Sequence, residues 1–230
     1  MEVFIMKKKP NPKKAIGIFV FLSLFFSIGY AVVRIIKTPD GGEHLRSDYV
    51  LMLLQCLLGL LVIGLPSFLE RKWSFEIPNY MSILYFLFLY CAIYLGEVRN
   101  FYYFVPHWDT ILHGFSGAML GAFGFTLVSI LNDSSKIKVT LSPIFVCLFA
   151  FCFAVAVGAL WEIYEFSGDA LFGLNMQKFR TADGTNLIGH AALSDTMKDL
   201  IIDSVGALVV VAVGYLAMLK TRKNKKDGVS

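Results

Sequence analysis

The sequence predicts an all-α integral membrane protein, a bundle of about six transmembrane helices with both termini in the cytoplasm. Of the 230 residues, 57% are hydrophobic and only 17% are charged, which is too apolar a balance for a soluble core. Six apolar stretches approach the roughly 20 residues needed to cross a bilayer. These continuous runs lack the alternation of barrel strands, so we expect each of them to be a helix.

One transmembrane domain of residues 15–219 is expected, between a basic cytoplasmic arm (1–14) and a basic cytoplasmic tail (220–230). Arg34 lies where a signal peptide would be cleaved, so the first span is interpreted as a retained anchor. The outer segment 167–194 carries several glycines and turn signals, and predicts a re-entrant loop or lid. The six spans cover about Ala15–Ile36, Tyr49–Leu69, Ile77–Leu95, Thr110–Leu131, Pro143–Phe166 and Leu200–Leu219.

The distribution of basic residues predicts the orientation. Fourteen of the 21 Lys and Arg residues lie in the two terminal segments and in the loops around Arg71 and Lys136, which the positive-inside rule places in the cytoplasm. All four histidines and twelve of the 17 acidic residues then lie on the outer side. The basic clusters adjoin spans, where topogenesis and attraction to membrane lipid explain them, so no nucleic-acid partner is expected.

Three polar motifs mark the outer ends of the last three spans. Ionisable side chains are costly within a bilayer, and their recurrence there indicates a functional site. Helical spacing lets the polar members of each motif face one region. Glycines at 114, 117, 121 and 124 favour close helix packing beside this site. The motifs are Trp108-Asp109-x3-His113, Trp161-Glu162-x2-Glu165 and Asp195-x3-Asp199-x3-Asp203.

Several of these residues also have a structural interpretation. Asp109 could be the N-cap of the fourth span, and Ser194 or Asp195 the N-cap of the sixth. Glu162 and Glu165 could reach bulk water beside the interfacial aromatic Trp161. His113 and Asp203 are expected deeper in the membrane, where neither interpretation applies. The three remaining histidines, His44, His107 and His190, lie in loops without ligand spacing and are expected on the surface, with His107 and His190 kept as remote candidates.

Carboxylates combined with one imidazole predict a divalent metal site for Mn, Fe or Zn, whereas an oxygen-only subset would suit Mg or Ca. Four or more carboxylates in a low-dielectric pocket need a compensating metal cation, retained protons, or a nearby positively charged side chain such as that of Arg180 or Lys198. Either Glu165 or Asp199 is the candidate general base for a metal-bound water. The predicted metal ligands are Asp109, His113, Glu162 and Asp203.

The same motifs resemble the YjdF-like family of bacterial inner-membrane proteins of unknown function. The resemblance covers about the C-terminal two thirds of the chain and implies a multi-pass inner-membrane protein, without implying an activity. The residues that carry it are Trp108, Asp109, His113, Gly117, Trp161, Glu162, Glu165, Asp195, Thr196, Asp199, Asp203 and Gly206.

Three functions remain open on the sequence. The first is a metal-dependent hydrolase or transferase that acts on a lipid-linked or phosphorylated envelope substrate. The second is a transporter or permease that couples solute movement to protons or cations through the same carboxylates. The third is a non-catalytic membrane partner protein with an acidic outer rim. Serine, cysteine and zincin signatures are absent from the sequence, as are Walker and dinucleotide fingerprints.

Overall fold

The computed structural model describes residues 12–38, 46–73, 76–134, 141–226 and 228. Most of the basic arm, the end of the tail, His44 and the loop with Lys136 and Lys138 lie outside the described residues. The described chain is helical throughout, apart from connecting segments and one isolated bridge between Arg180 and Asn186. The all-α prediction is confirmed.

Six described helical stretches are long and apolar enough to cross a membrane, which confirms the predicted number of spans. All six predicted spans overlap them, because continuous apolar runs of this length satisfy their backbone groups as helices in lipid. The stretches are Pro12–Lys37, Arg46–Lys72, Asn79–Val98, Trp108–Asn132, Pro143–Phe172 and His190–Asn224. The chain is therefore a multi-pass membrane protein.

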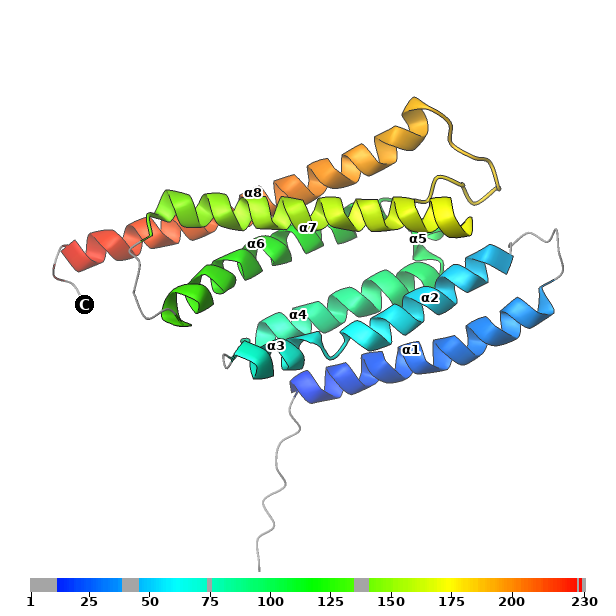
Figure 1. Cartoon of the computed structure of the whole chain (residues 1–230), viewed down its shortest axis with the longest axis horizontal. Coiled ribbons are helices and arrows are strands. Elements are labelled where there is room, and N and C mark those ends of the chain that lie inside the picture. Colours follow the sequence, from blue (N-terminus) through cyan, green and yellow to red (C-terminus); the bar gives the residue numbers. More distant parts are fainter. Residues whose placement is uncertain (1–11, 39–45, 74–75, 135–140, 227, 229–230) are drawn as a thin grey trace, which may run out of the picture. The chain divides into compact units, whose positions relative to one another are not determined.

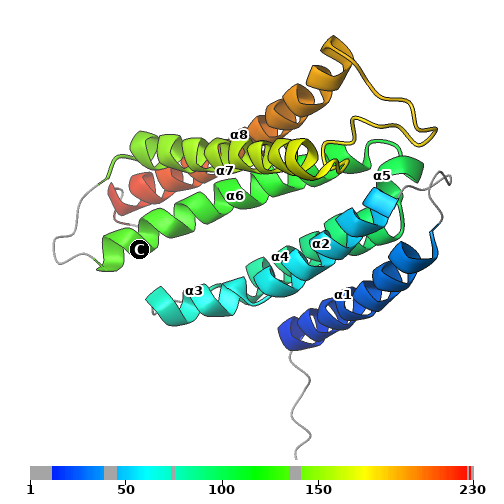
Figure 2. The same cartoon turned by 45° about the vertical axis from the view of Figure 1, so that its right-hand side comes forward.

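The chain divides into two compact units, and the first comprises residues Met1–Phe101. Its helices lie side by side around an apolar core that includes Val20, Leu24, Cys56, Phe86 and Ile93 (Figure 2). A π-helical segment, η1, continues the third span. The elements are α1 (Pro12–Lys37), α2 (Arg46–Val62), α3 (Leu65–Trp73), α4 (Asn79–Leu89) and η1 (Tyr90–Val98), followed by the short α5 (Phe101–Phe104) at the boundary with the second unit.

The second unit, Tyr102–Ser230, consists mainly of three long helices. They are α6 (Trp108–Ser134), α7 (Pro143–Phe172) and α8 (His190–Lys226). The chain reverses direction between successive helices (Figure 1), so the start of α6, the end of α7 and the start of α8 lie at one end of the unit. This arrangement brings the three polar motifs to the same end, as the sequence predicted.

The boundaries around the outer segment differ from the prediction. Helix α7 continues to Phe172 and ends at Gly173, whose φ of 63° is left-handed and whose N–H donates to the Asp169 carbonyl. Helix α8 begins at His190, before the start expected near Ser194 or Asp195 and before the apolar run that begins at Leu200. Hydropathy reports only the apolar part of a span, and residues 190–199 form a polar helical extension of it. Ser194 and Asp195 consequently lie inside α8, so the prediction that one of them caps this helix is wrong.

Glycines, which have no Cβ atom, let the helices of the second unit approach closely. A Cβ atom at Gly117 of α6 would lie 2.2 Å from the Asp203 carbonyl oxygen of α8. A Cβ atom at Gly206 would lie 2.3 Å from the carbonyl oxygen of Gly114. These distances confirm the predicted packing role of the glycine stripe, and they fix the backbone of α8 against the face of α6 that carries His113.

Candidate metal site

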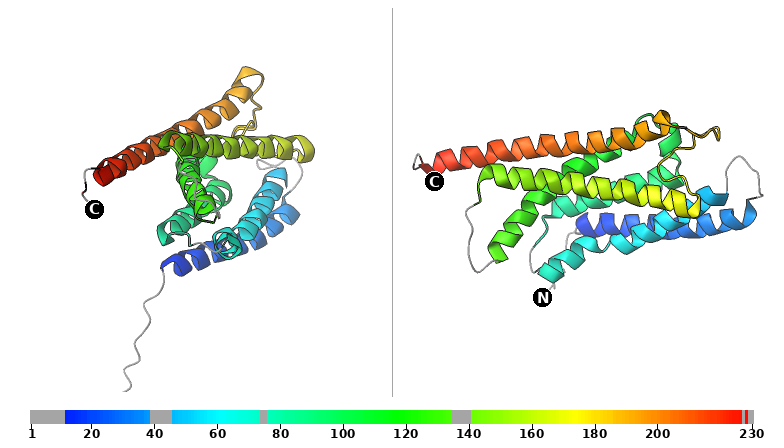
Figure 3. Two further views of the ribbon diagram at one scale, coloured as in Figure 1. Left: turned by 60° about the vertical axis from the view of Figure 1, so that its left-hand side comes forward. Right: turned by 45° about the horizontal axis from the view of Figure 1, so that its top comes forward.

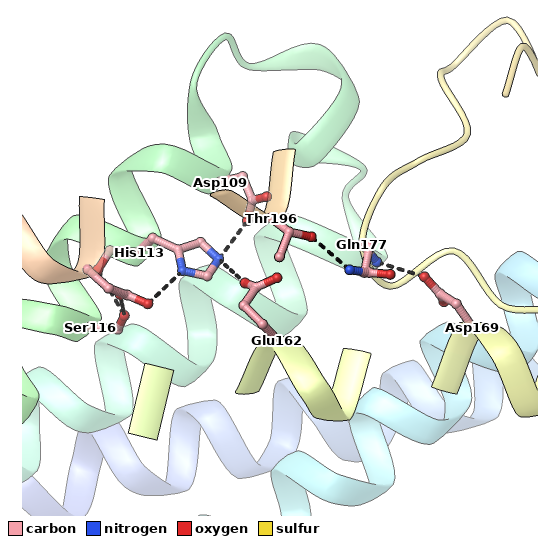
Figure 4. Close-up of polar contacts among 8 residues, drawn as sticks. Asp109, His113, Ser116, Glu162, Asp169, Gln177 and Thr196 are labelled. Carbon is pink, nitrogen blue, oxygen red and sulfur yellow. Dashed lines mark hydrogen bonds and ion pairs between the residues drawn. The ribbon is translucent and has the colours of Figure 1, made fainter. Parts of the chain in front are cut away.

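His113 is the centre of a buried polar cluster that draws on all three long helices. The residue is 8% exposed. The Nδ1 atom lies 3.2 Å from Oδ2 of Asp203 on α8. On the other side of the ring, Nε2 lies 3.7 Å from Oδ1 of Asp109 on α6 and 3.8 Å from Oε1 of Glu162 on α7 (Figure 4). The predicted convergence of the fourth, fifth and sixth spans is therefore observed.

Asp203 occupies a small space that glycines leave open. The residue is 3% exposed, and its Oδ1 atom accepts a hydrogen bond of 2.8 Å from the Ser116 hydroxyl. A Cβ atom at Gly158 of α7 would lie 2.6 Å from Oδ2 of Asp203. Both carboxylate oxygens are thus engaged, one by Ser116 and the other by His113. Sequence reasoning missed Ser116, although its position three residues after His113 places it on the same helical face.

A carboxylate of α8 besides Asp203, that of Asp199, also lies close to His113. Ligand atoms of Asp109, His113 and Asp199 lie within 4.8 Å of one another. Asp199 is 7% exposed and Glu162 is 5% exposed, so both carboxylates are removed from bulk water. Oε1 of Glu162 is a fully buried atom that makes no hydrogen bond within the described part of the chain. A buried carboxylate oxygen in this state is costly unless a cation or a proton satisfies it.

Glu165 and Asp195 lie one helical turn nearer the end of α7 and the start of α8, and both are half-buried, as Asp109 is, whereas His113, Glu162, Asp199 and Asp203 are buried. The Glu165 carboxylate interacts through its charge with Asp109, Glu162 and Lys178. Asp195 interacts in the same way with Asp109 and with Lys198. These two residues form the outer rim of the site, not its centre.

Asp109 lies at the second position of α6, and His107 immediately precedes that helix. The Asp109 side chain is directed towards the His113 ring (Figure 4), which is the functional orientation that the i, i+4 spacing predicted. His107 and His190 are both exposed; His107 precedes α6, and His190, which was expected in a loop, is the first residue of α8. Neither belongs to the group of described metal-ligating residues around His113.

The segment between α7 and α8 is tied to the site by a chain of polar contacts. The Asp169 carboxylate accepts hydrogen bonds from the backbone N–H groups of Met176 (2.6 Å) and Gln177 (3.0 Å). The Gln177 side chain in turn donates to the Thr196 hydroxyl at 2.8 Å (Figure 4). Thr196 lies next to the Glu162 carboxylate and interacts with it. Sequence reasoning gave no role to Asp169 or Gln177, because contacts between a loop and a helix leave no periodic signal.

The fold and this cluster define a class, a multi-pass membrane protein with a buried carboxylate and histidine site. The chain belongs to the family described as "Predicted membrane protein (DUF2238)", which it matches over residues 16–220. This membership is consistent with the resemblance to the YjdF-like family. A Thermotoga maritima protein described as "Uncharacterized protein" is 28% identical over 150 residues, which cover 65% of this chain and 69% of that relative. No solved structure matches the chain.

Proposed function

We propose that the protein holds a divalent metal ion between Asp109, His113, Glu162 and Asp199, and uses it to hydrolyse or transfer a lipid-linked or phosphorylated envelope substrate. The observation that carries the proposal is the buried Glu162 Oε1 atom, which faces His113 and has no hydrogen-bond partner within the described residues. Buried charged groups are normally paired or coordinate a metal, and this oxygen is suited to coordination.

The spacing of the atoms around Nε2 supports an ion in preference to direct hydrogen bonds. The distances of 3.7 and 3.8 Å to Asp109 and Glu162 exceed the range of about 2.7–3.2 Å for an N–H···O bond. Two ligand atoms that share a tetrahedral metal at its usual bond lengths are roughly 3.3–3.6 Å apart. A small inward movement of these side chains would therefore complete a coordination shell, with one imidazole nitrogen and carboxylate oxygens as ligands for Mn, Fe or Zn.

The two nitrogen atoms of His113 indicate different roles for the carboxylates on α8. Because Asp203 engages Nδ1, we assign it as the positioning residue that fixes the ring and leaves Nε2 directed at the metal, an arrangement common among histidine ligands. Asp199, whose oxygen lies near Asp109 and His113, takes the place among the ligands that the sequence gave to Asp203. Glu165 remains the candidate general base, because it lies one helical turn from Glu162 and is not among the proposed ligands.

We also propose that the site opens on the outer side of the membrane, with Ser230 in the cytoplasm. The excess of Lys and Arg in the terminal segments supports this orientation. A C-terminal fusion to a reporter that is active only in the cytoplasm should be active, and a reporter that is active only outside should be silent. The opposite pattern would place the cluster on the cytoplasmic side and remove the envelope substrate from the proposal.

Metal analysis of detergent-purified protein tests the site. The parent protein, incubated with Mn²⁺, Fe²⁺ or Zn²⁺ and desalted, should retain about one ion, whereas His113→Ala and Glu162→Gln should retain none. Asp203→Asn should weaken metal affinity by about 10–100-fold without abolishing binding, as expected for a group that positions a ligand. Asp199→Asn, which removes a proposed ligand, should have the larger effect of the two.

Asp183→Asn is the matched control, because this exposed carboxylate accepts hydrogen bonds from Thr181 and Thr185 outside the cluster. The Thr181 hydroxyl lowers the Asp183 pKa most, followed by the Thr185 backbone. The control should keep its metal. A metal-free parent under all three conditions would reject the proposal, and metal-independent proton or solute uptake by proteoliposomes would favour the transporter instead.

A further inference from the structure

An open groove runs between the first and third spans of the first unit. In this unit α1 packs along α4 and η1, which together form the third span (Figure 3). One side of the groove consists of α1 residues from Phe19 to Tyr30, and the other of Tyr94, Val98 and Arg99. Its volume of about 570 Å³ is within the range of about 300–1,000 Å³ in which proteins bind ligands. All of its lining residues except Arg99 belong to membrane spans, so its occupant comes from the bilayer.

The α1 side of the groove offers an apolar surface of defined length. Its residues recur at every third or fourth position, which places them on one face of the helix. Two of them are serines, but the Ser23 hydroxyl donates to the Phe19 carbonyl at 2.8 Å and the Ser27 hydroxyl to the Ser23 carbonyl at 2.7 Å. From Phe19 to Tyr30 a helix rises about 16 Å, about half of the roughly 30 Å hydrocarbon core of a bilayer. The groove therefore matches the depth of one lipid acyl chain.

Hydrogen-bond donors without a partner line the same groove. The rings of Phe19 and Tyr90 lie 5.3 Å apart, and from this contact both helices run towards the same face, α1 to Tyr30 and η1 to Arg99. Arg99 is exposed and directly follows the last residue of its span. Within the described residues, neither its guanidinium nor the hydroxyls of Tyr30 and Tyr94 form a hydrogen bond. Since no water in the bilayer core can satisfy such groups, the groove calls for an acceptor of negative charge at the Arg99 end.

We infer that this groove binds one anionic phospholipid, with an acyl chain along α1 and the phosphate at Arg99. The planar guanidinium fork matches a phosphate with two parallel hydrogen bonds, and the two phenolic hydroxyls can donate to phosphate or ester oxygens. A helix of a second copy in the groove would need a carboxylate at the level of Arg99 to meet the same charge, whereas a lipid supplies the chain and the anion in one molecule. The inference is independent of the proposed metal site, which belongs to the second unit.

Native mass spectrometry of the detergent-purified chain tests the polar end. The protein is titrated with phosphatidylglycerol or with phosphatidylcholine of identical acyl chains, and the parent should retain one phosphatidylglycerol with an affinity at least about fivefold higher. Arg99→Gln should weaken that affinity by about tenfold, and Arg99→Lys should recover part of it. Lys37→Gln is the matched control, because it removes a positive charge from the exposed end of α1 outside the groove lining. It should bind phosphatidylglycerol as the parent does.

A second pair of variants tests the apolar part of the groove. Leu22→Trp adds bulk inside it, whereas Leu61→Trp adds the same side chain on α2 at a position that is 78% exposed and outside the lining. At a temperature where all variants remain folded by thermal unfolding, only Leu22→Trp should lose the retained lipid. No preference for phosphatidylglycerol in the parent, or equal losses in Arg99→Gln and Lys37→Gln, would overturn the inference. A lipid-free dimer that Leu22→Trp dissociates would also overturn it, since the groove would then hold a second copy of the chain.

Discussion

The two compact units of this protein differ in what they bury. The first unit has an apolar core packed against further apolar side chains, and its buried polar residues, which include Ser27, Gln55 and Ser82, are uncharged. The second unit buries one histidine and three carboxylates, namely His113, Glu162, Asp199 and Asp203. Ionisable groups at membrane depth are expensive and by default functional. The candidate site therefore lies in the second unit, whereas the described core of the first unit is apolar.

The units also differ in what their glycines accommodate. In the second unit, the space left by Gly117 and Gly158 is occupied by the Asp203 backbone and carboxylate. In the first unit, the space left by Gly59 is occupied by the terminal methyl groups of Ile93 and Leu24. A methyl group at the end of a side chain can rotate away from an added atom, whereas a packed backbone, or a carboxylate held by both His113 and Ser116, has no equivalent freedom. Added side-chain volume should consequently damage the two units to different degrees.

The largest effect is expected from Gly158→Ala. The new methyl group would lie 2.6 Å from Oδ2 of Asp203, which holds His113 in place. We expect Asp203 to be displaced, with a loss of 1–3 kcal/mol in stability as an order of magnitude for overpacking, and a loss of metal binding of about tenfold or more. Thermal unfolding in detergent and Mn²⁺ titration measure the two quantities.

Gly121→Ala is the matched control for this prediction. It adds the same methyl group on α6, where the nearest atoms, the Cα and carbonyl oxygen of Ala207, are 3.4 Å away at ordinary contact distance. This variant should unfold within a few degrees of the parent and keep its metal affinity. If the two variants behaved alike, the space beside Asp203 would have no special role in the site.

Most of the fold could be predicted from the sequence, because a long apolar run in lipid has essentially one solution. The ends of α7 and α8 could not, because residues 167–172 and 190–194 continue the two helices beyond the apolar runs that hydropathy detects. The convergence of Asp109, His113, Glu162 and Asp203 was also predictable, since antiparallel helices return the three motifs to one end.

The division of roles within the cluster was not predictable. Which ring nitrogen of His113 meets which carboxylate depends on side-chain rotation and on the closeness of α6 and α8, and motif spacing determines neither. The turn formed by residues 175–180 could not be predicted from the sequence either. Asn175, Asp169 and the left-handed Lys178 act through single hydrogen bonds and one backbone angle, which have no repeating pattern in the sequence.

The smaller effect is expected from Gly59→Ala in the first unit, with Gly29→Ala as its control. A Cβ atom at Gly59 would lie 2.6 Å from Cδ1 of Ile93 and 2.8 Å from Cδ1 of Leu24, whereas one at Gly29 would meet no atom within 4 Å. Alanine favours helix over glycine by about 0.5–1 kcal/mol, which offsets part of the cost of moving two methyl groups.

The Gly59 variant should therefore lose at most about 1–2 kcal/mol in thermal unfolding, and Gly29→Ala should match or slightly exceed the parent. Both should bind Mn²⁺ as the parent does, because neither touches the second unit's cluster. A loss of metal from Gly59→Ala, at a temperature where the protein remains folded, would contradict the separation of the two units, since packing in the first would then control the site in the second.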